Sequence, residues 1–225
     1  MASATPEPVA LAILAKAPVA GSVKTRLIPA LGAEGAAALH ARLIERTVAT
    51  AGAAAIGPVT LWVTPAAPHA FFTALASFTA LALRFQFALA AQPDGDLGAR
   101  MLAACEAAAG PVIVIGTDCP ALTPSHLREA ADVLRAGTDV VVIPAEDGGY
   151  VLIGSRRPQP RLFDEMTWST DQVMAQTRQR LARGGLTWRE LAPLWDIDRP
   201  EDFARLRGAG LTHFLNGVTT SDLRL

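Results

Sequence analysis

A short loop near the start of the chain combines glycine with basic side chains in a way that suits phosphate binding. Lys16, Gly21, Lys24 and Arg26 follow a run of apolar residues. Backbone N–H groups of such a loop can donate to phosphate oxygens, and the basic side chains can neutralise developing phosphate charge. Of 20 basic residues only Lys16 and Lys24 are lysine, which favours a need for ammonium groups here. The competing interpretation is a solvated connection with basic residues at its rim.

A second candidate is the segment Gly116-Thr117-Asp118-Cys119-Pro120, which follows the apolar run 111–115. An aspartate that leaves a buried strand is placed to hold Mg²⁺ or Mn²⁺, because hard cations take carboxylate oxygens and phosphates supply the remaining ligands. The alternative is a turn aspartate that bonds its own backbone ahead of Pro120. Cys119 is interpreted as a small buried hydrophobe rather than a nucleophile.

A third acidic segment runs from Asp196 to Asp202. Asp198 and Glu201, with Pro200 between them, have the spacing of a helix capping box, and a cap explains the segment without any ligand. A Mg²⁺ site at Asp118 would nevertheless need a second carboxylate opposite it, because two acidic groups together with phosphates make a usable Mg²⁺ site.

Two further loops contain glycine next to aspartate. Gly95 and Asp96 precede a predicted helix that Asp96 could cap, and the run Asp147-Gly148-Gly149-Tyr150 could form a simple turn. Tyr150 is the only tyrosine in the chain, and it could line a pocket for an acceptor. The four histidines form no Ser/His/Asp or Cys/His arrangement, which disfavours hydrolysis through a nucleophile.

Strands alternating with helices must position these residues. The predicted strands span 9–16, 59–63, 81–89, 111–115, 140–143 and 150–153, and the predicted helices span 33–55, 68–76, 97–109, 124–135, 171–182 and 201–207. Ser169 and Gln172 have capping-box spacing before the helix at 171–182. The alternation predicts an α/β fold, a three-layer α/β/α sandwich around a mostly parallel mixed sheet. Ligands bind at strand carboxyl ends in such sheets, so the loops at 16–26, 92–98, 116–120 and 147–150 should wall one site.

Composition is consistent with a single domain over residues 1–225, because 51% hydrophobic and 18% charged content can form one substantial core. Two cysteines are too few for a disulfide framework. No run approaches the ~20 apolar residues of a membrane span, and no basic signal start precedes the first strand. We expect a cytoplasmic protein without membrane contact. A net charge of -1 disfavours nucleic-acid binding.

The ordered motifs resemble those of the DUF2064 family, glycosyltransferase-like proteins of the nucleotide-diphospho-sugar transferase (GT-A) superfamily, also labelled selenodomain-associated or arsenosugar-biosynthesis transferases. They are also similar to the guanylyltransferases of phospholactate and molybdenum-cofactor metabolism. The motifs are Lys16-x-Pro18-x-x-Gly21-x-x-Lys24-Thr25-Arg26-Leu27, Gly95-Asp96-Leu97-Gly98 with Arg100-Met101, Gly116-Thr117-Asp118-Cys119-Pro120, Asp147-Gly148-Gly149-Tyr150 and Asp196-x-Asp198-x-Pro200-Glu201-Asp202. The first loop has only Gly21 where the fuller nucleotidyltransferase signature is glycine-rich.

The resemblance implies a GT-A fold in which Asp118 and Asp198 share Mg²⁺ or Mn²⁺, with Lys24, Arg26 and Asp118 as the catalytic residues. Asp147, Gly148, Gly149 and Tyr150 would form the acceptor pocket. The implied nucleotide-binding residues are Ala15, Lys16, Pro18, Gly21, Lys24, Arg26, Gly95, Asp96, Arg100 and Asp118.

Two reactions fit these residues. One is nucleotidyl transfer from a nucleoside triphosphate to a small phosphorylated acceptor, which the lysines of the first loop slightly favour. The other is glycosyl transfer from a nucleotide-diphospho-sugar to a small-molecule acceptor, with Asp147 as a candidate base. A catalytically idle nucleotide-binding module is a further alternative, against which Asp118, Asp198 and Lys24 together weigh. The sequence leaves a homodimer open.

Overall fold

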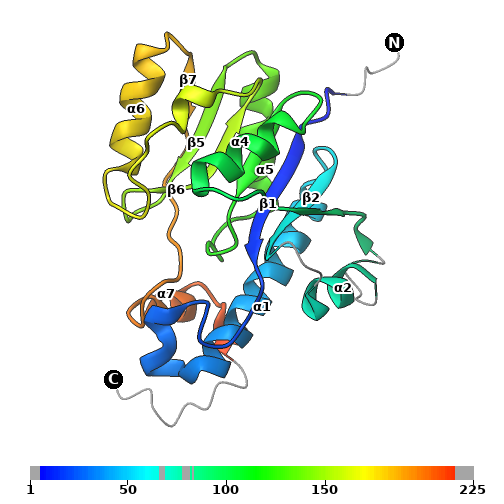
Figure 1. Ribbon diagram of the computed structural model, residues 1–225, viewed down its shortest axis with the longest axis vertical. Coiled ribbons are helices and arrows are strands. Elements are labelled where there is room, and N and C mark those ends of the chain that lie inside the picture. Colours follow the sequence, from blue (N-terminus) through cyan, green and yellow to red (C-terminus); the bar gives the residue numbers. More distant parts are fainter. Residues whose placement is uncertain (1–5, 66–68, 78–81, 83, 216–225) are drawn as a thin grey trace.

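A mixed β-sheet forms the centre of the computed structural model, which describes residues 6–65, 69–77, 82 and 84–215 (Figure 1). Within these residues the strand order is β3-β2-β1-β4-β6-β5-β7. The strands are β1 (Ala10–Lys16), β2 (Val59–Thr64), β3 (Ala88–Ala91), β4 (Val112–Ile115), β5 (Val140–Pro144), β6 (Tyr150–Ser155) and β7 (Trp188–Glu190). Strand β6 is antiparallel to β4 and β5, and the other pairings are parallel. The predicted mostly parallel α/β fold is confirmed.

Helices cover both faces of the sheet. They are α1 (Ile28–Ala54), α2 (Ala70–Ser77), α4 (Leu97–Glu106), α5 (Pro124–Arg135), α6 (Val173–Arg183) and α7 (Asp202–Gly208). Side chains alternate across β1: Leu11 and Ile13 pack with α1 and α5, whereas Ala12 packs with α4 and α6. This period of two is what a strand buried on both faces requires. The sandwich therefore has three layers.

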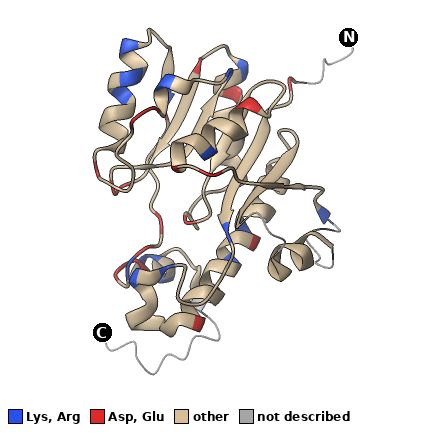
Figure 2. Cartoon of the chain, in the orientation of Figure 1, with Lys and Arg blue, Asp and Glu red and all other residues tan. Residues whose placement is uncertain are grey.

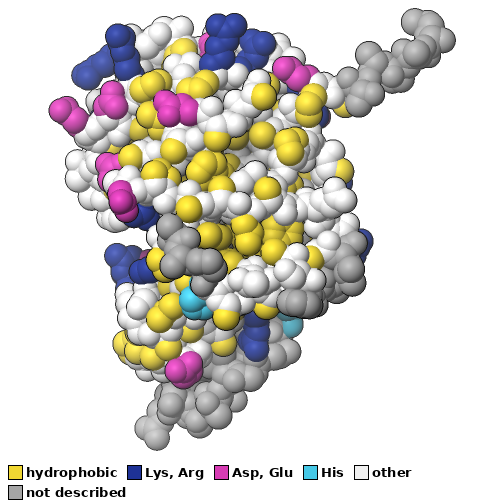
Figure 3. Space-filling model, turned by 45° about the vertical axis from the view of Figure 1, so that its right-hand side comes forward, with side chains coloured by type: hydrophobic (Ala, Val, Ile, Leu, Met, Phe, Trp, Pro, Cys, Tyr) yellow, Lys and Arg dark blue, Asp and Glu magenta, His cyan; other side chains and the backbone are white. Residues whose placement is uncertain are grey.

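A third, smaller core lies under α7. Leu27, Leu39 and Leu43 pack there against Ile197 and Phe203, which ties the start of α1 to the end of the chain. On the face in Figure 3, charged side chains gather toward one end of the molecule, and hydrophobic side chains reach the surface across the middle. No helix of the described residues is both long and apolar enough to cross a membrane.

The direction of the strand order reverses between β1 and β4. The chain first adds β2 and β3 on one side of β1, and then crosses to place β4 on the other side. Adjacent loops at the carboxyl ends of these two strands must therefore diverge and leave a crevice between them. Lys16 ends β1 and Asp118 follows β4 by three residues, so the topology itself brings the two first candidate segments together.

Several predicted elements differ from the structure. The strand predicted at 81–89 is wrong for most of its length, because Ala82 and Arg84 are helical and β3 occupies Ala88–Ala91; residues 81 and 83 lie outside the described residues, as does Pro68 of the helix predicted at 68–76. Helix α1 begins earlier than expected, with a break at Gly32, whose φ is 68°. Strand β7 was not expected, since its three residues are largely exposed and carry no apolar run.

Two predicted helix caps are also wrong. Ser169 adopts φ 62°, and α6 begins only at Val173 without a side-chain cap. At α7 the N-cap residue Glu201 makes no side-chain cap; instead Asp202, the first helical residue, accepts through Oδ2 from the N–H groups of Asp198 (2.9 Å) and Arg199 (2.8 Å). The carboxylate of Asp198 is therefore not used for capping. By contrast, α5 does begin with a side-chain cap, in which Thr123 and His126 form a reciprocal box.

Candidate functional site

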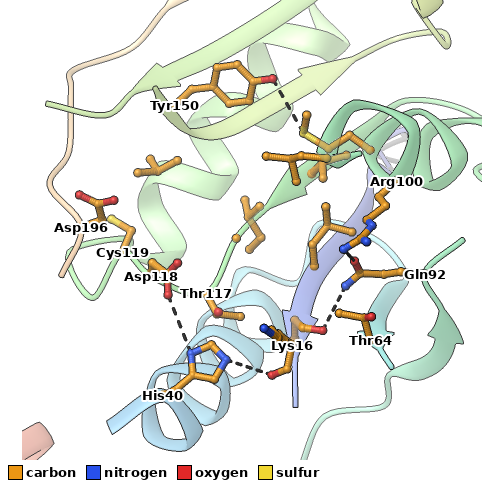
Figure 4. Close-up of a pocket in the computed structure, with 18 residues that line it drawn as sticks. Lys16, His40, Thr64, Gln92, Arg100, Thr117, Asp118, Cys119, Tyr150 and Asp196 are labelled. Atoms are coloured by element: carbon orange, nitrogen blue, oxygen red, sulfur yellow. Dashed lines mark hydrogen bonds and ion pairs between the residues drawn. The ribbon is translucent and has the colours of Figure 1, made fainter. Parts of the chain in front are cut away.

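A cavity of about 350 Å³ opens at the carboxyl ends of β1 and β4 (Figure 4). We call it the inner cavity. All four predicted loops contribute to its wall, the fourth through Tyr150 alone. The lining residues are Leu14, Ala15, Lys16, His40, Thr64, Gln92, Leu97, Arg100, Met101, Val114, Ile115, Gly116, Thr117, Asp118, Cys119, Tyr150, Val151 and Asp196.

Lys24 connects the first loop to the carboxylate that follows β4. Its backbone is left-handed, with φ 48°, and its side chain is only 4% exposed. Nζ lies 2.7 Å from Oδ1 of Asp118 and donates to the carbonyl oxygen of Ile197 at 2.6 Å. Burial of Oδ1 disfavours the ionised carboxylate, but the Lys24 ammonium outweighs it and holds the pKa of Asp118 below its usual value. The Asp118 carboxylate is therefore ionised at neutral pH.

Asp118 keeps an open side despite this pairing. Half of its side chain is exposed, although Oδ1 itself is buried. Part of the carboxylate consequently faces the cavity and remains available to a ligand.

Asp198 also lies near the Lys24 ammonium. Its Oδ1 is 4.0 Å from Nζ, and its Oδ2 accepts a hydrogen bond from Nη1 of Arg26. In Figure 2 acidic residues mark the connection that runs from β7 toward α7, close to this cluster in sequence. Two predicted cations and both predicted metal carboxylates thus meet in one place.

His40 was not singled out by the sequence, yet it lines the inner cavity from α1. Its Nε2 is 3.0 Å from the carbonyl oxygen of Lys16, an acceptor, so this nitrogen must carry the hydrogen. Nδ1 lies 3.9 Å from Oδ1 of Asp118 and is buried without a hydrogen-bond partner among the described residues. Burial lowers the pKa of His40, against the opposing effect of Asp118. The imidazole is therefore neutral and supports the end of β1.

Asp196 lies where two cavities meet, and the predictions left it out of the ligand set. A second, more polar cavity of about 850 Å³ adjoins the inner one, and both are lined by Asp118, Tyr150 and Asp196. We call it the outer cavity. Burial, and then the neighbouring charge of Asp147, raises the pKa of Asp196 to about 6. Lys24 opposes this rise only in part, so a carboxylate with a raised pKa lies near Asp118.

The predicted acceptor residues line the outer cavity in part. Asp147, Gly149 and Tyr150 contribute to its wall, together with Trp168 and Arg26. Gly148 does not, but it is tightly packed: a Cβ there would lie 2.3 Å from the carbonyl oxygen of Asp171. Its own carbonyl accepts from the N–H of Met174 at 2.8 Å. This contact fixes the 147–150 turn against the start of α6.

Four predicted nucleotide-binding residues line neither cavity: Pro18, Gly21, Gly95 and Asp96. Asp96 caps α4 by accepting from the N–H of Ala99 at 2.8 Å, and its other oxygen accepts from Nε1 of Trp168 at 3.1 Å. Gly95 and Gly21 have φ of 119° and 79°, values that favour glycine. These residues shape the loops rather than face the cavities.

The donor set at the cavity junction suits a hard divalent cation. Within the described residues no group of three or more His, Cys, Asp or Glu converges as a metal site. Asp118 nevertheless has an exposed oxygen, and Asp196 and Asp198 add carboxylates nearby. Mg²⁺ commonly uses only one or two carboxylates and completes its shell with phosphate oxygens and water. The residues therefore fit such an ion when a phosphate ligand is also bound.

Comparison with known proteins adds a family. A family model described as an uncharacterized protein conserved in bacteria (DUF2064) matches residues 47–170, more than half of the 225 residues. No curated protein matches the sequence.

Solved structures confirm the fold. A protein of Desulfovibrio desulfuricans G20, provisionally assigned as a nucleotide-diphospho-sugar transferase, is 26% identical with a TM-score of 0.79, over 96% of this chain and 94% of that chain. A Methanothermobacter nucleotidyl transferase is 18% identical with a TM-score of 0.60, over 93% and 99% of the two chains. Glucosyl-3-phosphoglycerate synthase of Mycobacterium tuberculosis, solved with Mn²⁺ and UDP, is 11% identical with a TM-score of 0.52, over 92% and 78%. The latter two share the fold alone.

Proposed function

The chain belongs to the DUF2064 family, and from this premise we propose that it is a transferase that uses a nucleotide carrying a di- or triphosphate together with Mg²⁺ or Mn²⁺. One observation carries the proposal: the ion pair between Lys24 and Asp118 at the crevice between β1 and β4. It joins a loop suited to phosphate with a carboxylate suited to a hard cation. We also propose that residues 1–225 form one domain.

Nucleotidyl transfer is the leading reaction. In this reaction an oxygen of a small acceptor, such as a phosphate group, attacks the α-phosphorus of a nucleoside triphosphate, and pyrophosphate leaves. Lys24 and Arg26 would neutralise the charge on the phosphate oxygens. Asp118 and Asp198 would hold the cation, which supplies Lewis-acid stabilisation of phosphate charge. The concentration of cationic side chains in the first loop supports this reaction over its alternative.

Glycosyl transfer is the second candidate. The provisional assignment of the Desulfovibrio protein supports it, and so does the outer cavity, where Asp147 lies beside Tyr150 and could act as a base toward an acceptor hydroxyl. The same cation site would then hold the diphosphate of a nucleotide-sugar. The two reactions share the nucleotide and differ in the bond that breaks.

A thermal-shift panel tests the proposal. Nucleoside triphosphates and nucleotide-diphospho-sugars are added with and without Mg²⁺ or Mn²⁺. A ligand at ~100 times its dissociation constant adds about 2.7 kcal/mol, and each kcal/mol raises Tm by roughly 2–4 °C for a chain of this size. A rise with a triphosphate only when metal is present supports nucleotidyl transfer. A rise with a nucleotide-sugar alone supports glycosyl transfer, and no shift with any nucleotide contradicts both.

A further inference from the structure

The inner cavity has a cationic corner that the proposed chemistry does not use. Arg100 extends from α4, and in Figure 4 it lies across the cavity from Asp118 and Asp196. Its Nε is buried and has no hydrogen-bond partner among the described residues. Its Nη1 lies 3.5 Å from Oε1 of Gln92. A buried donor without an acceptor is costly. Because Nε is closed to solvent, a ligand in the cavity would meet the guanidinium at its terminal nitrogens.

Gln92 holds Arg100 rather than offering its own donors to a ligand. Its side-chain nitrogen donates to the carbonyl oxygens of Ala15 (3.1 Å) and Trp62 (2.8 Å), one in β1 and one in β2. Carbonyl oxygens only accept, so they fix the orientation of the amide and turn Oε1 toward Arg100. Both amide hydrogens are thereby occupied. Lys16 and Thr64 also line the cavity, and the guanidinium of Arg100 is the donor group that the Gln92 amide positions for a ligand.

A guanidinium recognises a particular arrangement of acceptors. Its neighbouring N–H groups form a rigid fork that binds two acceptors placed side by side. Guanine presents such a pair at O6 and N7, and cytosine presents one at O2 and N3. Adenine and uracil place a donor beside the acceptor on the corresponding edges, so one N–H of the fork would stay unpaired. Leu14, Met101 and Val114 add apolar walls that suit a flat base.

We propose that Arg100 selects the base of the bound nucleotide, taking guanine or cytosine in preference to adenine or uracil. The inference rests on the proposed function, because phosphates held near Lys24 and Asp118 would leave the opposite corner of the cavity for the base. Gln92 is the positioning residue that keeps the guanidinium in place. This selection does not depend on the reaction type or on the acceptor, because a nucleoside triphosphate and a nucleotide-sugar both present a base to the cavity.

Calorimetric titration of the four ribonucleotides tests the proposal. GTP, CTP, ATP and UTP are titrated with Mg²⁺, and the four nucleoside diphosphates are titrated alongside. A bidentate contact discriminates between bases by roughly 5- to 150-fold in dissociation constant. The wild type should bind the guanine or the cytosine nucleotide tighter by this factor, and comparison of those two identifies the base. Equal affinity for all four, or preference for adenine or uracil, would overturn the inference.

Substitutions then assign the selection to Arg100. Arg100→Lys keeps the charge but removes the fork, so all four nucleotides should bind with similar affinity; Arg100→Gln should do the same with weaker binding. Arg128→Lys is the matched control, because Arg128 donates to the carbonyls of Ala53 and Ala54 away from the cavity. Preference retained in folded Arg100→Lys would reject the role of this residue. A wild type that binds no nucleotide would instead contradict the proposed function itself.

Discussion

Lys24 and Asp118 form a 2.7 Å ion pair between the loop after β1 and the loop after β4. The ammonium is almost completely buried, whereas half of the carboxylate side chain is exposed to the cavity. The pair thus fixes the spacing between a phosphate-binding candidate and a metal-binding candidate before any ligand arrives. Preorganised charge of this kind needs little rearrangement on binding.

Asp118→Asn should abolish metal-dependent nucleotide binding while the fold persists. The amide can still accept from Lys24 but is a poor ligand for Mg²⁺. We expect the metal-dependent part of the affinity to fall by more than about 10-fold, the lower end of the loss seen even for outer-shell partners. Calorimetry with and without Mg²⁺ measures it. Asp132→Asn is the control, because the Asp132 side chain is 72% exposed and its only ion pair among the described residues is with Arg135. Unchanged affinity in Asp118→Asn would remove Asp118 from the metal site.

Lys24→Ala should weaken binding of di- and triphosphates far more than binding of the parent nucleoside. The lost interaction is a charge-assisted contact to phosphate, for which we expect a loss on the order of 10-fold. Dissociation constants for nucleoside, monophosphate, diphosphate and triphosphate separate the two effects. Equal losses across the series would point to a disordered loop rather than a missing phosphate contact, because Lys24 also bonds the carbonyl of Ile197.

Asp196→Asn should stabilise the ligand-free protein at neutral pH but not in acid. The pKa of Asp196 is raised to about 6 in the folded chain, against about 3.9 when unfolded. Ionisation therefore costs stability, beginning as pH rises through about 4 and reaching its full value above about 6. Since the side chain is partly exposed, we expect a gain on the order of 1 kcal/mol, or roughly 2–4 °C in Tm.

Thermal denaturation of Asp196→Asn and wild type at about pH 4 and about pH 7.5 checks this linkage. The difference in Tm should be close to zero at the lower pH and positive at the higher. A difference of the same size at both would show that packing, rather than charge, sets the effect. Saturating Mg²⁺ and nucleotide should shrink the difference at the higher pH, because a bound cation compensates the carboxylate charge.

Gly148→Ala should destabilise the fold. The backbone there has φ 94°, and a Cβ would lie 2.3 Å from the carbonyl oxygen of Asp171. Such strain costs on the order of 1–3 kcal/mol, which urea denaturation would show as a lower midpoint. Gly110→Ala is the matched control, because a Cβ at Gly110 meets no atom within 4 Å and should be nearly neutral. Equal midpoints for the two variants would contradict the tight packing of the 147–150 turn.

The central part of the fold was predictable because its apolar patterns are strong. Strand β4 is buried along its entire length, and such a continuous run flanked by turn residues is a clear signal. At the two edges of the sheet the signal fails. Strand β3 consists of alanine and leucine that are mostly exposed, and β7 pairs with β5 through Trp188, Arg189 and Glu190. Edge strands such as these are set by tertiary pairing, which residue type alone does not reveal.

The charged half of the site was predictable for a different reason. Lys24 and Asp118 lie in loops that contain glycine and proline and that follow strongly apolar strands, which is where ligand-binding residues are expected in such a sheet. His40, by contrast, lies in the middle of a long helix, and nothing local distinguishes it from a surface histidine. Gln92 acts through main-chain carbonyls of two other strands. Asp196 and Asp198 belong to the same sequence motif, and only the structure distinguishes them. Asp196 lines both cavities, whereas Asp198 lines the outer cavity alone.

Because β6 runs antiparallel to β5, the loop between them can be exchanged without altering the other walls of the outer cavity. Because β5 and β6 form a hairpin, residues 145–149 leave the sheet and return to it at the same edge, with Pro144 paired to Tyr150. Lengthening such a closed loop is inexpensive, since doubling its length costs about 0.6 kcal/mol. A grafted hairpin tip could therefore give the scaffold a different acceptor specificity while β1, β4 and the residues after them stay untouched, provided that the graft keeps a glycine where Gly148 meets Asp171.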